Sequence, residues 1–265
     1  MIDIVKAENE FKKFLENYDM NDEKVILKVT HTYGVVDASE KLAKALNLNE
    51  EDTKLSKLIA LLHDIGRFEQ TKANIKIYDR ADSNLFDHAE YGVKILFEDG
   101  LIRNFIEDAS YDDIIYKAIK NHNKLKIEEG LNEKELLHAK LIRDNDKTDN
   151  FRVKGTETFK VLLGTDDTQE IFASKVTDKI YSEFMNENLI NTADVQTHLD
   201  RWMGYMAFIF DYNFAEGLKY LNDNNMVNSC FNRMQCTDSD SIEKLNNMRS
   251  VANNYINKRI ICINE

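Results

Sequence analysis

The sequence predicts an all-α protein, because helix-breaking residues are scarce and apolar residues recur at helical spacing. The 265 residues include no proline and only nine glycines, the two residue types that most disrupt helices. Leu, Ile, Lys, Glu and Asn are abundant. Apolar residues make up 43% of the chain and charged residues 31%, which is typical of a soluble globular protein with a sizeable core and not of a disordered chain.

Two helices are expected in the first 46 residues. The first, Asp3–Leu15, is amphipathic, and it is predicted to direct three apolar side chains inward: Val5, Phe11 and Leu15. Asn21 or Asp22 can cap the second helix, which continues to about Leu46. His31 lies on an apolar face of this second helix together with Gly34, Val35, Ala38, Leu42 and Ala45.

The third helix is expected to be buried and to end in two polar residues. It begins at Glu50–Asp52, where acidic side chains suit the positive end of the helix dipole. It ends within Leu58–Gly66, LIALLHDIG, which is apolar up to His63 and Asp64. Gly66 is predicted to lie just past the end of the helix. A buried Asp is costly unless it is paired or binds a metal ion, so this stretch is a candidate site.

A loop and two further helices are expected between residues 67 and 122. Arg67–Asn84 shows no sustained period and is predicted to be a loop that could contain one helical turn. Leu85–Phe97 is predicted to be a helix with His88 on its apolar face. Ser110 is predicted to cap the next helix, which ends at His122.

The remaining chain is also predicted to be helical. Asn132 and Glu135 form a predicted capping box for a helix that continues to about Lys154 and carries Asp146 on an apolar face. Beyond Gly155 the period weakens, and helices are expected near Asp166–Glu187, Ala193–Asn213, Ala215–Asn222 and Ser239–Asn257. No linker composition appears, so we expect residues 1–155 to form one helical domain and residues 156–265 a helical extension packed on it as one compact unit.

Charge and cysteine content indicate the compartment and the class of partner. The net charge of −12 disfavours nucleic acid or an anionic membrane as the main partner. The three cysteines have no CxxC spacing, which favours reduced thiols in a cytoplasmic protein. The N-terminal residues lack the apolar stretch of a signal peptide, and no run is long enough to span a membrane.

Five apolar helix faces each carry a residue or pair able to bind a metal ion: His31, His63–Asp64, His88, His122 and Asp146. Taken alone, each is more often a hydrogen-bonded buried histidine or a capping carboxylate. Together they include four of the six histidines, and imidazole with carboxylate is a ligand set for zinc, iron, manganese or nickel. Helical bundles build such sites from side chains on facing helices. Of the other histidines, His138 could support a ligand near Asp146, and His198 is predicted to be structural.

The order of these residues resembles that of the HD-domain superfamily of metal-dependent phosphohydrolases. The resemblance covers about Asp22–Phe151 and rests on His31, the HDIG sequence at His63–Gly66, and Asp146–Lys147 in RDNDKTDNF. It implies that His31, His63, Asp64 and Asp146 ligate one metal ion in a helical HD-domain bundle. Asp144 and Asp149 lie close by, and Asp146 is preferred because a Lys follows it, as in the superfamily.

The resemblance also implies a second metal ion. DHAEYG around His88, and the later His122, look like the additional ligands of binuclear members, in which Asp64 bridges both ions. The chain departs from the HD-GYP cyclic-dinucleotide phosphodiesterases, because it has no GYP sequence and a single His at 122 rather than a pair. It also lacks the HDxxEDT form of the alarmone hydrolases. Neither of those substrates is therefore indicated.

What the resemblance implies is an enzyme that hydrolyses a phosphoester of a nucleotide or another small phosphorylated metabolite with a metal-bound hydroxide. Two divalent ions are expected, and the residues do not distinguish Fe, Mn, Zn, Ni and Mg. Asp64 would bridge the ions, while Arg67 and Lys147 would bind phosphoryl oxygens. Arg143 could act in the same way or form an exposed salt bridge. Two alternatives stay open: a diiron oxygenase with the same ligands, and a non-catalytic metal-containing protein that binds a nucleotide.

Overall fold

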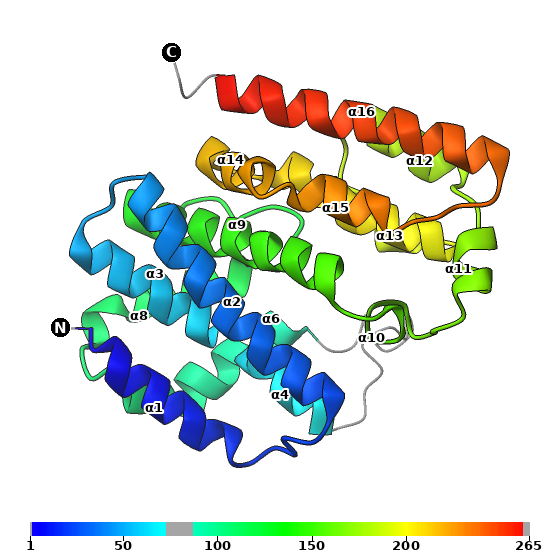
Figure 1. Cartoon of the computed structure of the whole chain (residues 1–265). Helices are drawn as coiled ribbons and strands as arrows, with labels where there is room; N and C mark the ends of the chain where they lie inside the picture. Colours follow the sequence, from blue (N-terminus) through cyan, green and yellow to red (C-terminus); the bar gives the residue numbers. More distant parts are fainter. Residues whose placement is uncertain (1, 73–86, 262–265) are drawn as a thin grey trace. The chain divides into compact units, whose positions relative to one another are not determined.

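The predicted all-α fold class is confirmed. The computed structural model describes residues 2–72 and 87–261, and over these ranges it contains helices and turns but no strand (Figure 1). The chain forms two compact units, Met1–Asp149 and Asn150–Glu265. None of the helices in the described ranges is both long enough and apolar enough to cross a membrane. The predicted boundary after residue 155, and the packing of the extension on the first domain, stay predictions.

The first unit is built from helices that are mostly short. They are α1 (Ile4–Leu15), α2 (Glu23–Ala45), α3 (Glu50–Leu62), α4 (Ile65–Lys72), α6 (His88–Val93), the π-helix η1 (Lys94–Glu98), α7 (Ile102–Phe105), the 3₁₀ helix η2 (Ala109–Tyr111), α8 (Asp112–Asn121) and α9 (Glu133–Thr156). The last of these, α9, continues from the first unit into the second.

The second unit contains the remaining elements. They are α10 (Phe159–Leu163), α11 (Thr168–Ala173), α12 (Asp178–Met185), η3 (Thr192–Asp194), α13 (His198–Met206), η4 (Ala207–Asp211), α14 (Ala215–Asp223), α15 (Met226–Asn232) and α16 (Ser239–Ile261). The predicted helix over 166–187 is divided between α11 and α12, because the buried carboxylate of Asp200 accepts a hydrogen bond from the backbone N–H of Thr177 at 2.9 Å. Trp202 is fully buried in this unit.

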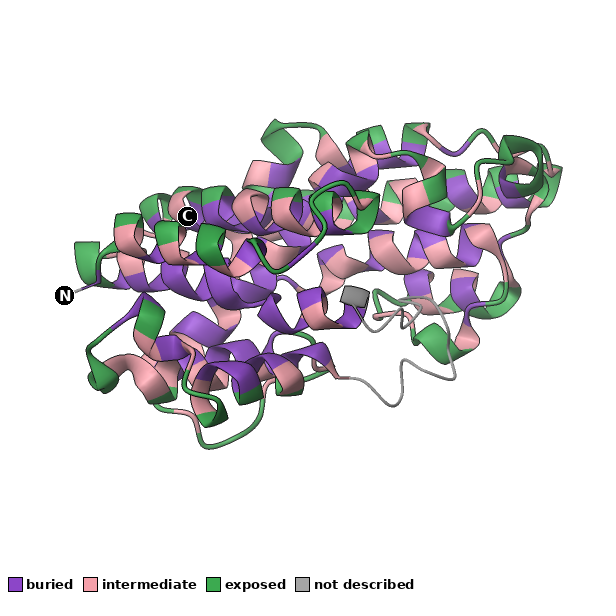
Figure 2. Cartoon of the chain, turned by 90° about the horizontal axis from the view of Figure 1, so that it is seen from below, coloured by how far each residue is buried: buried purple, intermediate pink, exposed green. Residues whose placement is uncertain are grey.

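Helix α3 is the central helix of the first unit, since α1, α2 and α8 all pack against it. Its buried side chains lie all round the helix, and they include Leu55, Leu58, Ile59, Leu61 and Leu62. Most other helices have one buried and one exposed side (Figure 2). In α1 the buried side carries Ala7, Phe11 and Leu15, whereas Val5 is 69% exposed. The predicted inward direction of Val5 was therefore wrong, because Val5 lies off the stripe at four-residue spacing.

The chain enters a new helix directly after Asp64, where a loop was predicted. Helix α4 spans Ile65–Lys72, so the predicted loop from Arg67 was wrong for its first six residues. Residues 73–84 of that predicted loop lie outside the described part of the chain. Ile65 and Phe68 are both fully buried, and the Phe68 ring packs edge-on against Phe11. The eight residues of α4 contain too few apolar side chains for a helical period to be visible in the sequence.

Gly66 lies in the first turn of α4 and not past the end of a helix, which corrects the sequence-based assignment. A Cβ at this position would lie 2.3 Å from the carbonyl oxygen of His88 and 2.8 Å from the backbone nitrogen of Gly92. Glycine therefore permits the close approach of α4 and α6. This approach brings His88, the first residue of α6, next to the His63–Asp64 pair.

Three other helix starts were predicted from the sequence, and the structure confirms only part of them. Asn132 and Glu135 exchange hydrogen bonds with each other's backbone N–H groups, at 2.9 and 3.0 Å, so the predicted capping box is confirmed. Ser110 does not cap α8, because it lies within the 3₁₀ helix η2 and α8 begins only after Tyr111; its hydroxyl donates to the side chain of Asp108. The predicted helix over 85–97 begins at His88, after Asp87 as its cap, and continues as the π-helix η1.

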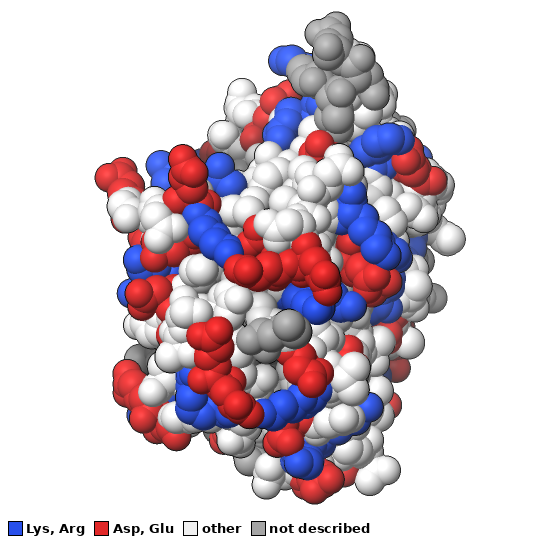
Figure 3. All heavy atoms as spheres, turned by 90° about the vertical axis from the view of Figure 1, so that its left-hand side faces the viewer, with Lys and Arg blue, Asp and Glu red and all other residues white. Residues whose placement is uncertain are grey.

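The surface carries charges of both signs. On the face drawn in Figure 3, Lys and Arg side chains lie among Asp and Glu side chains. Ion pairs at four-residue helical spacing include Lys41–Asp37 and Lys54–Glu50. The net charge of the whole chain remains −12.

The contact between α4 and α6 gives a matched pair of substitutions. Gly66→Ala should destabilise the protein by roughly 1–3 kcal/mol, because a methyl group is forced against backbone atoms. Gly92→Ala, on the other side of the same contact, should be neutral or slightly stabilising, because its Cβ would meet its nearest atoms at 3.5 Å and Ala favours helix. Denaturant unfolding measures both, and equal stabilities for the two variants would contradict this account of Gly66.

Candidate metal centre

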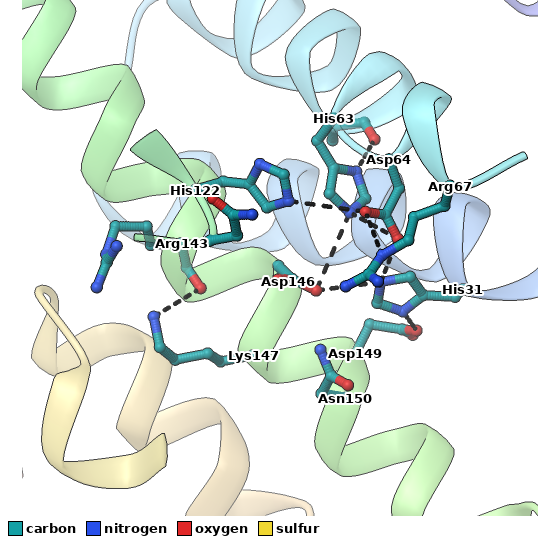
Figure 4. A network of polar contacts seen from close by, with 12 residues as sticks. His31, His63, Asp64, Arg67, His122, Arg143, Asp146, Lys147, Asp149 and Asn150 are labelled. Atoms are coloured by element: carbon teal, nitrogen blue, oxygen red, sulfur yellow. Dashed lines mark hydrogen bonds and ion pairs between the residues drawn. The ribbon is translucent and has the colours of Figure 1, made fainter. Parts of the chain in front are cut away.

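The structure brings all six predicted metal ligands into one cluster, although they come from five segments of the chain. His31 lies in α2, His63 and Asp64 lie between α3 and α4, His88 begins α6, His122 directly follows α8, and Asp146 lies in α9. Figure 4 shows five of them converging, with their side chains directed toward one another. The four histidines and Asp64 are buried, and Asp146 is partly exposed.

The two carboxylate oxygens of Asp64 face two different pairs of histidines. Oδ2 lies 3.9 Å from Nε2 of His31 and 3.9 Å from Nε2 of His63. Oδ1 lies 3.4 Å from Nε2 of His88 and 3.6 Å from Nε2 of His122. We call these two groups the His31 half and the His88 half of the cluster. Asp64 is shared by both halves, and each half has ligand atoms within 4.8 Å of one another.

Asp146 adds a second carboxylate to the His31 half. Its Oδ1 lies 3.1 Å from Nε2 of His31 and 4.0 Å from Nε2 of His63. Asp149, the other nearby carboxylate, is placed differently, because its Oδ2 lies 2.7 Å from Nδ1 on the opposite side of the His31 ring. Asp149 is 2% exposed, so this carboxylate is buried beside the ring.

His63 and His122 are held in the same way, by the last turn of the helix that precedes each of them. Nδ1 of His63 lies 2.7 Å from the carbonyl oxygen of Ala60, and Nδ1 of His122 lies 2.7 Å from that of Ile119. Carbonyls at a helix end need donors. A carbonyl can only accept, so each Nδ1 carries the proton and each Nε2 presents a lone pair to the cluster.

The lone pair of His63 supports the interpretation as a metal site. Nε2 of His63 is buried and has no hydrogen-bond partner among the described residues, and a buried polar atom without a partner calls for an explanation. Burial lowers the pKa of His63 to about 4, and burial also holds the pKa of His88 well below its usual value. Both rings are therefore neutral near pH 7, which is the form that binds metal ions.

The two candidate ligand carboxylates, Asp64 and Asp146, are ionised, as metal ligands must be. Burial alone would raise the pKa of Asp64, but the Lys28 ammonium and the neighbouring His63 hold it well below its usual range. Burial would likewise raise the pKa of Asp146, and the hydrogen bond with His31 outweighs that effect and lowers it. The donor set of neutral imidazoles and carboxylates thus fits divalent metal ions.

His31 differs from the other histidines because carboxylates lie at both of its ring nitrogens. Burial by itself would lower the pKa of His31, but the hydrogen bonds with Asp146 and Asp149 raise it to about 9. The imidazolium form is therefore favoured near pH 7 when no metal ion competes for Nε2.

Two cationic side chains lie beside Asp64, one at each oxygen. Nε of Arg67 lies 3.6 Å from Oδ1, as expected for the residue that follows HDIG. Nζ of Lys28 lies 3.4 Å from Oδ2. Lys28 was not predicted from the sequence, although its position one helical turn before His31 was the available signal.

Two other basic residues are not brought to the cluster. The ammonium of Lys147 donates to the carbonyl of Arg143 at 3.2 Å, and its side chain points away from the histidines (Figure 4). Adjacent helical residues point in different directions, so Lys147 does not share the direction of Asp146. Arg143 is buried and not exposed, and its guanidinium donates to backbone carbonyls at the end of α8 and after it, including that of Asn121 at 3.0 Å.

The remaining histidines lie outside the cluster. Nε2 of His138 pairs with Oδ1 of Asp52 at 3.1 Å, which joins α9 to α3. Nε2 of His198 pairs with Oε1 of Glu170 at 3.0 Å in the second unit. His198 is therefore structural in the described contacts, and the contact of His138 is with Asp52 and not with a candidate ligand.

The part of the chain that carries the candidate ligands matches a known protein family. Residues 29–150 match the family model of the HD domain, and all six candidate ligands lie within the match. This part of the chain is therefore similar to HD domains, and the groups of side chains that could hold a metal ion lie within it. Neither the curated proteins nor the solved structures include a match to the chain.

The raised pKa of His31 predicts how metal binding depends on pH. A ligand nitrogen must lose its proton before it binds, so the apparent affinity should rise as the pH increases from 7 to about 9 and level off above. Calorimetric titration of chelator-treated protein with Co²⁺, in buffers of different ionisation enthalpy, should show release of about one proton at pH 7.5. An affinity that stays constant between pH 7 and 9 would contradict the described environment of His31.

Proposed function

We propose that the HD domain of residues 29–150 hydrolyses a phosphate ester with the help of two divalent metal ions. The observation that carries the proposal is the position of Asp64, whose two oxygens face two separate pairs of histidines. Such a carboxylate can bridge two ions in the spacing that phosphoryl-transfer sites use. Bound there, divalent ions supply an acidified water molecule and neutralise charge on phosphoryl oxygens.

Each half of the cluster would hold one ion. His31, His63, Asp146 and Oδ2 of Asp64 would hold the first. His88, His122 and Oδ1 of Asp64 would hold the second. The contact of 3.0 Å between Nε2 of His88 and Nε2 of His122 supports the second assignment, because two nitrogens that point at one position are suited to a shared cation.

The charge of the cluster favours an anionic substrate. Three carboxylates, on Asp64, Asp146 and Asp149, stand against two cationic side chains, on Lys28 and Arg67. With all four histidines neutral, as metal ligands must be, the formal sum is one negative charge, so two divalent ions would leave the cluster positive. A phosphate ester brings negative charge to this place, and metal ions are often the largest charges in their site.

Arg67 is the residue best placed to bind the phosphate. Its Nη1 donates to Oε1 of Gln70 at 3.0 Å, which orients the guanidinium beside Asp64. Its Nε is buried and has no hydrogen-bond partner within the described residues. A guanidinium with an unused N–H donor is suited to phosphoryl oxygens, because arginine can bind them through two parallel hydrogen bonds. Lys28 would add a second positive charge at the other oxygen of Asp64.

The proposal extends to the class of substrate and to the compartment. A small phosphorylated molecule, such as a nucleotide, is the proposed substrate, because the net charge of −12 disfavours long polyanions. A cytoplasmic location is proposed on the cysteine pattern. No role for Lys147 in catalysis is included, since its ammonium contacts the carbonyl of Arg143.

Metal content and hydrolysis test the proposal together. Wild-type protein should hold two ions per chain and hydrolyse p-nitrophenyl phosphate or its diester. His88→Ala should lose one ion, Asp64→Ala should lose both, and each variant should lose activity. His198→Ala, which removes a histidine outside the cluster, should keep both ions. Elemental analysis and absorbance at constant protein concentration measure these results.

Three outcomes would contradict this account. A single ion in wild type, unchanged in His88→Ala and His122→Ala, would overturn the two-ion site. Two bound ions without hydrolysis of any phosphoester would overturn the proposed reaction. Consumption of O₂ by an iron-loaded protein would favour the diiron oxygenase alternative instead.

The role of Arg67 can be tested separately from metal binding. Arg67→Ala should raise KM for the phosphoester by roughly 10- to 100-fold, because it removes charged hydrogen bonds each contributing about 1.5–3 kcal/mol, while the metal content stays unchanged. Arg103→Ala is the control, since Arg103 pairs with Asp112 at the surface of the same unit. Loss of metal from Arg67→Ala, or equal effects of the two substitutions, would contradict the assignment.

A further inference from the structure

Helix α9 carries two buried charged residues, one turn before and one turn after Asp146. Arg143 and Asp149 are 3% and 2% exposed. Their spacing of three residues on either side places them on the same face of the helix as Asp146. Each of them contacts a segment that presents a candidate metal ligand, and the two segments belong to different halves of the cluster.

Asp149 contacts the histidine of the first half. Its Oδ2 lies 2.7 Å from Nδ1 of His31, so the opposite nitrogen, Nε2, is directed at Asp146 and Asp64. A buried carboxylate is costly without a partner, which makes this pair a strong constraint on the ring. Carboxylates that accept from the distal nitrogen of a ligand histidine fix its orientation and increase its basicity.

Gly34 makes the contact between Asp149 and His31 possible. It lies one helical turn after His31 in α2, and a Cβ at this position would lie 1.8 Å from Oδ1 and 2.4 Å from Cγ of Asp149. No side chain larger than hydrogen can therefore occupy position 34 while Asp149 keeps its place. The lack of a side chain at Gly34 thus leaves the space that the Asp149 carboxylate occupies beside His31.

Arg143 contacts the segment that presents the histidine of the second half. Its guanidinium donates to the carbonyl of Asn121 at 3.0 Å, to the carbonyl of Lys124, and to that of Leu125 at 3.4 Å. These carbonyls lie on both sides of His122 along the chain. The planar guanidinium thus fixes the turn from which the His122 ring reaches Asp64.

We propose that α9 positions both halves of the metal centre, with Asp149 orienting His31 and Arg143 fixing the turn that carries His122. Both are positioning residues and neither binds an ion itself. The inference rests on the metal centre of the proposed function and adds that the affinities of the two ions are set separately, each by one residue of the same helix. Partners of this kind change metal affinity by about 10- to 100-fold.

Titration with Co²⁺ tests the inference in the full-length protein. Asp149→Asn keeps the shape of the side chain and should weaken one of the two ions by about 10- to 100-fold, leaving the other unchanged. Gly34→Ala should have the same effect, because it displaces the carboxylate. Arg143→Lys keeps the charge but loses the planar donors, and it should weaken the other ion.

A background with one site assigns each effect to a half. In His88→Ala protein only the ion of the His31 half remains, and Asp149→Asn should weaken it while Arg143→Lys should not. Two matched controls lie elsewhere: Asp52→Asn removes a carboxylate paired with a buried histidine, and Arg233→Lys removes an arginine bound to backbone carbonyls. Neither control should change the affinity for Co²⁺, whatever it does to the melting temperature.

The outcomes separate this inference from the proposed function. Selective weakening of one ion by each variant supports it. Equal weakening of both ions in step with the melting temperature, or unchanged affinities, would overturn it. Wild-type protein that binds no Co²⁺ would overturn the metal centre itself, and the inference with it.

Discussion

The first unit depends on one buried carboxylate, Asp64, whose two oxygens face two different sets of side chains. Asp64 is 4% exposed, and a carboxylate at such a depth is stable only if charge or hydrogen bonds compensate for its lost hydration. The chain places a cationic side chain beside each oxygen, Lys28 on one side and Arg67 on the other, and each oxygen also faces two histidines. Helices α2, α3, α4, α6 and α8 are arranged so that their ends or faces meet at this residue.

The fold uses helix ends to aim the ligands. His63 and His122 each follow the last residue of a helix and turn back to a carbonyl three residues earlier, so the helix itself selects the ring nitrogen that faces the cluster. His88 lies instead at the N-terminal end of a helix, because it is the first residue of α6, which Asp87 caps. Helix α9 runs past the cluster and supplies Asp146 together with the two residues proposed to position its neighbours.

The sequence was sufficient for the fold class and for the members of the cluster, because a lone polar residue on an apolar helix face is conspicuous. His31, His88 and His122 could be selected on that ground, and the structure places them together. Residues that act through another residue left no such signal. Asp149 looks like a surface charge, and Gly34 looks like a small residue on an apolar face. Their roles follow from the contact between His31 in α2 and Asp149 in α9, two residues that are 118 positions apart in the sequence.

Diffraction from crystals soaked with Co²⁺, measured at the cobalt absorption edge, tests the central claim most directly. The account predicts two anomalous peaks roughly 3.5–4 Å apart, one beside each oxygen of Asp64, with His31 and His63 at the first and His88 and His122 at the second. A single peak held through one oxygen of Asp64, with His88 and His122 bonded only to each other, would contradict a shared carboxylate between two metal ions.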